Sequence, residues 1–271
     1  MARNGEADKV KAREAGAIEA VVSAMTTHAF DAGVQQAACS ALRFTVSFRD
    51  ESQAQAREAG AIEAVVSAMS THAVDAGVQQ AACWALRHTA LCSMTEGMAD
   101  SQARAREAGA IEAVVSAMST HADEMCLHWS ACQALESMTA GMADSQARAR
   151  EAGAIEAVVS AMSTHVDERW LQCDGCTALR SMTAGMADSQ ARAREAGAIE
   201  AVARAMQRHE GSGWLEDSAM EALSSLASDN SYNIRRIRRL RGAALPPNIP
   251  DTRASEARRR LRSVLERRDA E

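Results

Sequence analysis

The chain has 271 residues, of which 47% are hydrophobic but only 3% aromatic, and its formal net charge of −6 is ordinary for a soluble protein. No stretch approaches 18 consecutive apolar residues, which excludes a transmembrane helix, and the polar N-terminus lacks a signal-peptide pattern. Seven cysteines in such a chain indicate free thiols in a reducing compartment. We therefore expect a cytoplasmic protein, with the nucleus as the alternative.

One heptapeptide, Ala-Gly-Ala-Ile-Glu-Ala-Val, occurs five times along the chain. The intervals between its glycines are 44, 49, 44 and 44 residues. A repeat period of this length is typical of stacked supersecondary units rather than of a single closed core. The glycines are Gly16, Gly60, Gly109, Gly153 and Gly197.

Residues 100–140 represent one repeat and begin with a predicted short helix. Asp100 and Ser101 are candidates for the N-cap, because their side-chain oxygens can accept hydrogen bonds from free backbone N–H groups. Residues 102–108 are strong helix formers. Gly109 is expected to end the helix, since glycine adopts the left-handed conformation without steric cost.

A second helix is predicted directly after the glycine, and residues 119–121 are expected to end it. Its apolar side chains recur at helical spacing. They are Ile111, Val114, Val115 and Met118. A third helix is predicted from about residue 126 to residue 138. The glycine precedes the third-helix leucine by 26 residues in every repeat, so the five extra residues of the second repeat fall after Leu86. They lengthen either the third helix or the loop behind it.

Three helices in about 44 residues, with a glycine between the first and the second, resemble the armadillo repeat. The matching segments are Arg-Glu-Ala-Gly-Ala-Ile-Glu-Ala-Val-Val and, in the third helix, residues 78–86, Val-Gln-Gln-Ala-Ala-Cys-Trp-Ala-Leu. Among armadillo proteins the chain is most similar to divergent protist arrays and to the armadillo segment of leucine-rich-repeat kinases. The resemblance implies an all-α fold, namely a right-handed α-solenoid of about five three-helix repeats over residues 1–242. The units are 8–50, 51–99, 100–143, 144–187, 188–228 and a partial unit, 229–242.

All three prolines lie within residues 246–250, which predicts a linker over 243–252. Residues 253–271 form a predicted basic amphipathic helix that caps the open end of the array. The same basic segment could instead contact nucleic acid, an anionic membrane or an acidic partner. It lacks interleaved aromatic residues, which argues against nucleic acid. The arginines concerned are Arg235, Arg236, Arg238, Arg239, Arg258, Arg259 and Arg260.

The resemblance also implies that the third helices line a concave groove that holds a partner. Peptide-binding armadillo proteins repeat a tryptophan and an asparagine there, and only Trp84 matches this pattern. Trp84 and Trp129 are either an aromatic anchor for a partner or filling between repeats, whereas Trp170 and Trp214 are interpreted as structural. The predicted groove residues are Gln36, Ser40, Phe44, Gln80, Trp84, His88, Trp129, Gln133, Ser137, Cys173, Thr177, Ser181, Asp217, Glu221 and Ser225.

Other reactive residue types recur in register and are interpreted as structural. A histidine follows each second helix, where it meets the negative end of the helix dipole, and a cysteine recurs on the buried side of the third helix. The single Cys173-x-x-Cys176 pair has no second pair at zinc spacing. With no phosphate loop and no catalytic constellation, we expect no enzyme activity, cofactor or metal.

The predicted function is a non-enzymatic scaffold or adaptor that binds a protein or peptide partner along the third helices. One alternative is a nucleic-acid or membrane-surface adaptor that acts through the arginine-rich C-terminal segment. The other is a regulatory arm of a larger enzyme.

Overall fold

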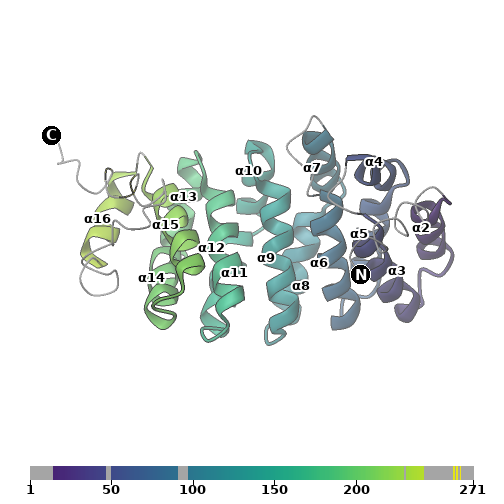
Figure 1. Cartoon of the computed structure of the whole chain (residues 1–271), viewed down its shortest axis with the longest axis horizontal. Helices are drawn as coiled ribbons and strands as arrows, with labels where there is room; N and C mark the ends of the chain where they lie inside the picture. The colour runs from purple at the N-terminus through teal and green to yellow at the C-terminus, as the bar shows by residue number, and fades with distance from the viewer. Residues whose placement is uncertain are drawn as a thin grey trace. The chain divides into compact units, whose positions relative to one another are not determined.

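The computed structural model describes residues 15–46, 50–90, 97–228 and 230–240, together with the tail positions 259, 261 and 263. Within these ranges the regular structure is α-helical without strands, as predicted (Figure 1). No helix in them is both long enough and apolar enough to cross a membrane. The chain divides into two compact units, residues 1–138 and 139–271, and each is described by itself below.

In its described residues the first unit has three second-type helices, three third-type helices and two first-type helices. Its third helices pack in sequence, with α3 along α6. The first helices are α4 (Asp50–Glu58) and α7 (Gly97–Glu107); the second helices are α2 (Ala17–Thr27), α5 (Ala61–Thr71) and α8 (Ala110–Thr120); the third helices are α3 (Ala32–Thr45), α6 (Ala76–Ala90) and α9 (Met125–Thr139).

The second unit repeats this arrangement, with α12 packed along α15 (Figure 1). Its first helices are α10 (Ala143–Glu151), α13 (Ala187–Glu195) and α16 (Ser231–Leu240); its second helices are α11 (Ala154–Thr164) and α14 (Ala198–Arg208); its third helices are α12 (Arg169–Thr183) and α15 (Gly213–Ala227).

The glycine of the repeated heptapeptide separates the first helix from the second, as predicted. Gly153 has φ +80°, and the other four glycines of the motif lie between +74° and +81°. The N–H of Gly153 donates to the carbonyl of Arg150, which satisfies one of the free carbonyls at the end of α10. Directly after the turn, Ile155 and Val158 are fully buried. The heptapeptide therefore sets the sharp change in chain direction and the first core contacts of the second helix.

The predicted N-cap of the first helix is wrong. Helix α7 begins at Gly97, three residues before Asp100, and Ser101 is buried inside the helix. In the second unit the N-cap of α10 is Met142, with no side-chain capping bond, and Asp144 lies in the first turn. The acidic residue of this motif therefore stabilises the positive end of the helix dipole instead of capping a backbone N–H group.

The third helix of the second repeat is described up to Ala90, directly before the position of the extra residues at 91–96. Helix α6 has 15 residues, the same number as α9, α12 and α15. Both predicted alternatives, a longer third helix and a longer loop, concern residues 91–96, which lie outside the described part of the chain.

Buried glutamines tie the helices of one repeat together. Gln79 donates from Nε2 to the carbonyls of Met69 (2.7 Å) and His72 (2.9 Å) at the end of α5. Gln102 of α7 donates to the carbonyl of Ser137 in α9 (2.7 Å), and Gln146 of α10 donates to that of Ser181 in α12 (2.6 Å). These bonds satisfy carbonyls at helix ends that would otherwise be buried without partners. They fix the third helix against both other helices of its repeat.

The recurring histidine ends the second helix, as predicted, and its ring also joins successive repeats. In the first unit, Nε2 of His72 lies 2.8 Å from the carbonyl oxygen of Ala29, and Nε2 of His121 lies 3.0 Å from that of Ala73. In the second unit His209 makes the same contact with Val166 (2.9 Å). A carbonyl oxygen only accepts, so Nε2 carries the proton in each bond. The histidine position is therefore a connector between repeats, a role that the sequence analysis did not predict.

Helix α16 takes the place of a first helix after α15. Asn233 donates from Nδ2 to the carbonyl of Leu226 (2.8 Å), and Ile237 is buried. Arg236 pairs with Glu200 of α14, as Arg192 of α13 pairs with Glu156 of α11. The arginine run of this segment thus contributes one side chain to the packing of the array.

Most of the predicted C-terminal segments fall outside the described residues. These include the linker 243–252 and the side chains of Arg258 and Arg260. At positions 259, 261 and 263 the backbone is helical, with Leu261 buried and Arg259 exposed. The capping role of residues 253–271 stays a prediction.

Candidate partner-binding faces on the third helices

Two tryptophans of the first unit meet on its third helices. The ring centroids of Trp84 on α6 and Trp129 on α9 lie 5.2 Å apart, with the rings nearly perpendicular. Trp84 is only 9% exposed, and Trp129 is half-buried. Such edge-to-face pairs contribute about 0.5–1.5 kcal/mol beyond area burial. Trp84 therefore fills space between successive third helices, while Trp129 and its surroundings reach the surface.

Two arginines lie against the same tryptophan. The guanidinium carbon of Arg43 on α3 lies 4.3 Å from the centroid of Trp84, and that of Arg87 lies 5.6 Å away. Arg87 also donates from Nη1 to Oε1 of Gln133 on α9 (2.8 Å). Phe44, which is 59% exposed, lies 5.3 Å from the Arg43 guanidinium. We call these six residues the arginine–aromatic face: Arg43, Phe44, Trp84, Arg87, Trp129 and Gln133.

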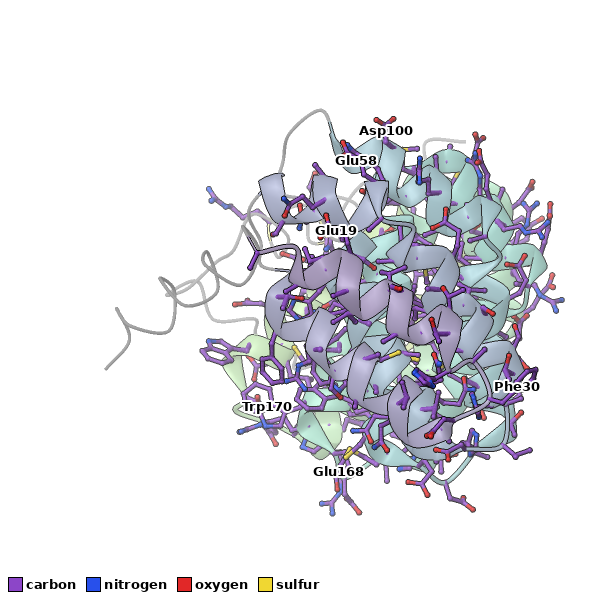
Figure 2. All side chains as sticks on the ribbon, turned by 90° about the vertical axis from the view of Figure 1, so that its right-hand side faces the viewer. Glu19, Phe30, Glu58, Asp100, Glu168 and Trp170 are labelled. Carbon is purple, nitrogen blue, oxygen red and sulfur yellow. The ribbon has the colours of Figure 1, made fainter. Side chains whose placement is uncertain are left out.

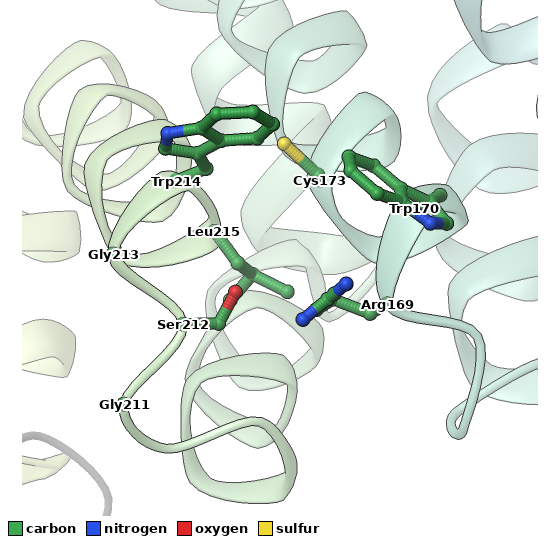
Figure 3. Close-up of a pocket in the computed structure, with 8 residues that line it drawn as sticks. All are labelled: Arg169, Trp170, Cys173, Gly211, Ser212, Gly213, Trp214 and Leu215. Atoms are coloured by element: carbon green, nitrogen blue, oxygen red, sulfur yellow. The ribbon is translucent and has the colours of Figure 1, made fainter.

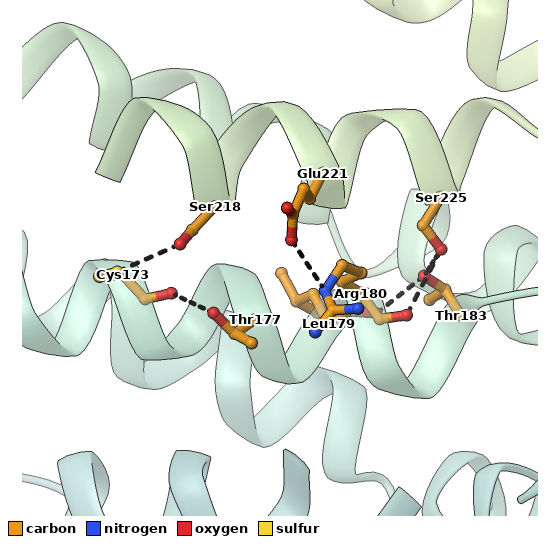
Figure 4. Close-up of polar contacts among 8 residues, drawn as sticks. All are labelled: Cys173, Thr177, Leu179, Arg180, Thr183, Ser218, Glu221 and Ser225. Carbon is orange, nitrogen blue, oxygen red and sulfur yellow. Dashed lines mark hydrogen bonds and ion pairs between the residues drawn. The ribbon is translucent and has the colours of Figure 1, made fainter. Parts of the chain in front are cut away.

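The second unit carries polar contacts at the equivalent place, between α12 and α15 (Figure 4). Sγ of Cys173 and Oγ of Ser218 share a hydrogen bond of 3.2 Å, and the hydroxyls of Thr183 and Ser225 share one of 3.0 Å. Between them, Nε of Arg180 lies 3.3 Å from Oε2 of Glu221. The third-helix face of this unit is therefore held by polar pairs where the first unit uses aromatic rings.

A single repeat position supplies the arginine in each case, and the sequence analysis missed it. Arg43, Arg87 and Arg180 each follow the conserved third-helix leucine directly. Each contacts the next third helix three positions earlier in the repeat, where the chain has Trp84, Gln133 and Glu221. The repeated Leu-Arg pair was the available signal, but its partner depends on how successive repeats stack.

Trp170 and Trp214, for which a structural role is predicted, contact each other at the surface of the second unit. They are 51% and 73% exposed, and Trp170 projects away from the helices (Figure 2). Their ring centroids lie 5.9 Å apart, and the Arg169 guanidinium lies 5.0 Å from the ring of Trp170. Both occupy the first turn of a third helix, ahead of the part that packs in the core. With Cys173 and the turn before α15 they line a pocket of about 440 Å³ (Figure 3).

The other predicted groove residues differ in accessibility. Gln133 is buried, and its Oε1 accepts from Arg87. Ser137 and Ser181 are also buried, and their main-chain carbonyls accept from the first-helix glutamines. We therefore leave these two side chains out of the proposed faces. The exposed members are Gln36, Phe44 and Glu221; the half-buried members are Ser40, Gln80, His88, Trp129, Cys173, Thr177, Asp217 and Ser225.

The arginines of the basic run in α16 also differ from one another. Arg235 and Arg239 are exposed, and Arg238 is half-buried. Arg236 is paired with Glu200. The run therefore lies largely on the exposed side of a packed helix, with Arg236 engaged in an ion pair.

The buried third-helix cysteines are core residues, as predicted. Burial raises the pKa of Cys39 and of Cys83 to about 12, because a thiolate would lose its hydration there. Among the described residues, no group of three or more His, Cys, Asp or Glu side chains is placed to hold a metal ion.

We expect the cysteines to alkylate in an order set by burial. In the folded chain at pH 8, iodoacetamide should modify the exposed Cys126 quickly and leave Cys39 and Cys83 almost unmodified, since very little thiolate exists at a pKa of about 12. Peptide mapping by mass spectrometry measures the three rates, and unfolding in urea should equalise them. Equal rates in the folded chain would contradict the described packing of the third helices.

The comparisons with known proteins agree with this architecture. The family model described as LRRK2 ARM repeat matches residues 47–233, well over half of the chain. The chain therefore belongs to the armadillo-repeat proteins. Within them, its family is that of the LRRK2 armadillo repeats. No curated protein sequence matched the chain.

Solved structures with the same fold include both designed and natural proteins. An engineered protein is 27% identical, with a TM-score of 0.76, covering 92% of this chain and 97% of its own. A designed armadillo repeat protein in complex with the peptide (KR)4 is 19% identical, with a TM-score of 0.74, covering 92% and 98%. A structure from work on the cadherin–β-catenin interaction is 18% identical, with a TM-score of 0.66, covering 89% of this chain and 46% of that one. The last two likenesses concern the fold alone.

Proposed function

We propose that the chain is a non-enzymatic scaffold that binds an extended protein or peptide segment on the third-helix faces of its two units. The observation that carries the proposal is that exposed and half-buried aromatic side chains gather on these helices, next to polar side chains that differ from one repeat to the next. Phe44 and the half-buried Trp129 provide an aromatic surface in the first unit, and Trp170 and Trp214 provide one in the second. Tryptophan, other aromatic residues and arginine are the side chains most enriched at protein interfaces.

The third helices vary more between repeats than the second helices do, and this contrast supports the same proposal. The second helices α8 and α11 have identical sequences, and their recurring apolar side chains pack in the core. The third helices α9 and α12 share the buried Cys-x-Ala-Leu pattern and four further residues, and they differ at the other eight of their fifteen positions. A constant frame with variable exposed positions fits a protein whose partner is recognised by the third helices. Comparable designed armadillo proteins bind a peptide, as the (KR)4 complex states.

The proposal can be tested by selecting random peptides on the immobilised full chain and measuring their binding to matched variants. Ser40→Arg on α3 and Thr177→Arg on α12 place a bulky charged side chain at half-buried positions of the two proposed faces. Ser67→Arg on α5 and Ser160→Arg on α11 make the same kind of change at exposed second-helix positions. Selected peptides should lose at least about tenfold in affinity to one of the third-helix variants.

The second-helix variants should bind these peptides as the unchanged chain does. None of the four positions is buried, so the thermal midpoints of the variants should stay close to that of the unchanged chain. The proposal is contradicted if no peptide is selected, or if the second-helix substitutions weaken binding while the third-helix ones do not.

A further inference from the structure

We infer that the arginine–aromatic face of the first unit recognises a short acidic segment, in which two carboxylates flank an apolar or aromatic side chain. This inference rests on the proposed function and names the chemistry of its partner. The partner's carboxylates would meet the guanidinium groups of Arg43 and Arg87, and its apolar side chain would lie between Phe44 and Trp129.

Among the described residues, the two arginines have no acidic partner. Neither Arg43 nor Arg87 makes an ion pair with an acidic side chain in the described part of the chain, and their contacts are with Trp84, Phe44 and Gln133. Arginines elsewhere in this unit are paired: Arg104 with Glu63, and Arg106 with Glu107. The positive charge of the face is therefore available to an anionic ligand.

Both guanidinium groups are held in place before any ligand arrives. Stacking on Trp84 fixes the plane of Arg43, and the bond from Nη1 of Arg87 to Gln133 fixes that side chain. The remaining N–H groups of a fixed guanidinium match the two oxygens of a carboxylate. A partner then loses little affinity to the ordering of long side chains.

The repeat itself provides an internal comparison. Arg180 occupies the same repeat position in the second unit, but there the contacted residue is Glu221, whose carboxylate lies 3.3 Å away. In the second unit, therefore, a carboxylate of the chain itself neutralises the arginine at this repeat position. In the first unit the arginine at the same position contacts a tryptophan or a glutamine instead. An anionic ligand in the first unit would take the place that Glu221 occupies in the second.

The surroundings favour a short acidic peptide over a nucleic acid. Within residues 15–46, 50–90 and 97–138 the chain has thirteen acidic residues and only five arginines. A nucleic-acid strand, with one charge per phosphate, would meet repulsion around the two arginines. A short segment with two carboxylates fits a positive site of this size.

Fluorescence anisotropy with labelled peptides tests the inference on the full chain. The probe is a peptide of sequence Gly-Ser-Glu-Leu-Phe-Glu-Ser-Gly with blocked termini, and its control replaces both glutamates by glutamine. The acidic peptide should bind at least about tenfold more tightly than the amide peptide, and added salt should reduce the difference. The double variant Arg43→Gln/Arg87→Gln should lose this preference.

A matched variant removes the same charge elsewhere in the unit. Arg104→Gln/Arg106→Gln takes away two arginines that are already paired, and it should bind the acidic peptide within about twofold of the unchanged chain. Arg43→Lys/Arg87→Lys keeps the positive charge but lacks the planar guanidinium group with its paired N–H donors, and it should bind the acidic peptide with intermediate affinity. Circular dichroism before and after heating checks that each variant is folded.

The inference is overturned if the acidic and amide peptides bind equally well, or if both double glutamine variants weaken binding to the same extent. It is also overturned if an oligothymidylate binds this face more tightly than the acidic peptide does. Should the random-peptide selection return neutral or basic peptides that still depend on the third helices, the acidic preference fails while the proposed function stands. A selection that returns nothing removes both.

Discussion

Replacement of Gln172 by leucine is expected to lower the free energy of unfolding by about 2–3 kcal/mol. The buried Nε2 of Gln172 donates to the carbonyls of Met162 and His165, both at 2.8 Å. Leucine has a similar volume but no donor, so two carbonyls at the end of α11 would stay buried without this partner, and each such loss costs about 1–3 kcal/mol. Urea unfolding followed by circular dichroism measures the change.

The chain supplies its own control for this substitution. At the equivalent position of the preceding repeat, His128 donates from Nε2 to the carbonyl of Met118 (3.1 Å). Gln172→His should therefore retain most of the stability that Gln172→Leu loses. If both variants unfold at the same urea concentration, the hydrogen bond is not what stabilises this turn.

Replacement of Gly153 by valine is expected to cost about 2 kcal/mol of stability. Gly153 has φ +80°, and the left-handed conformation costs an L-residue about 1–2 kcal/mol, with a β-branched side chain among the least tolerant. The added Cβ would meet little besides a carboxylate oxygen of Glu156, so the cost comes from the backbone rather than from a clash. The thermal midpoint and the urea midpoint should both fall.

Gly213 provides the matched control. It begins α15 with an ordinary helical backbone, and a Cβ added there meets open space. Gly213→Ala should leave the stability unchanged or raise it by about 0.5–1 kcal/mol, because alanine favours the helix. A similar loss of stability in both variants would show that the heptapeptide glycine has no special backbone role.

The three-helix unit of this protein could be predicted from its sequence because every repeat carries the same local signals. The period, the glycine at the first turn and the helical spacing of Ile111, Val114 and Met118 all indicate the same three-helix unit. Local signals of this kind act within one helix or one turn, so they need no knowledge of how repeats stack. The one local prediction that is wrong, the N-cap at Asp100, depended on where the helix starts, and capping residues can also lie inside a first turn.

The candidate faces could be located only approximately, since they depend on contacts between repeats. Nothing in the sequence near Arg43 says that its guanidinium stacks on Trp84, about forty residues later. The two partners meet because α3 lies along α6 at a particular offset. The exposure of Trp170 and Trp214 could not be predicted for the same reason. A tryptophan in a first helical turn is covered or free according to the height at which the neighbouring helix begins.

Site-specific photo-crosslinking tests most directly the central claim that the third-helix faces receive a partner segment. A peptide selected on the full chain is made with a photoreactive residue at its centre, irradiated in the complex and mapped by mass spectrometry. The account predicts adducts on exposed positions of α3, α6, α9, α12 or α15, with competition by the unlabelled peptide. Adducts confined to α2, α5, α8, α11 and α14, or to residues 241–271, would contradict it.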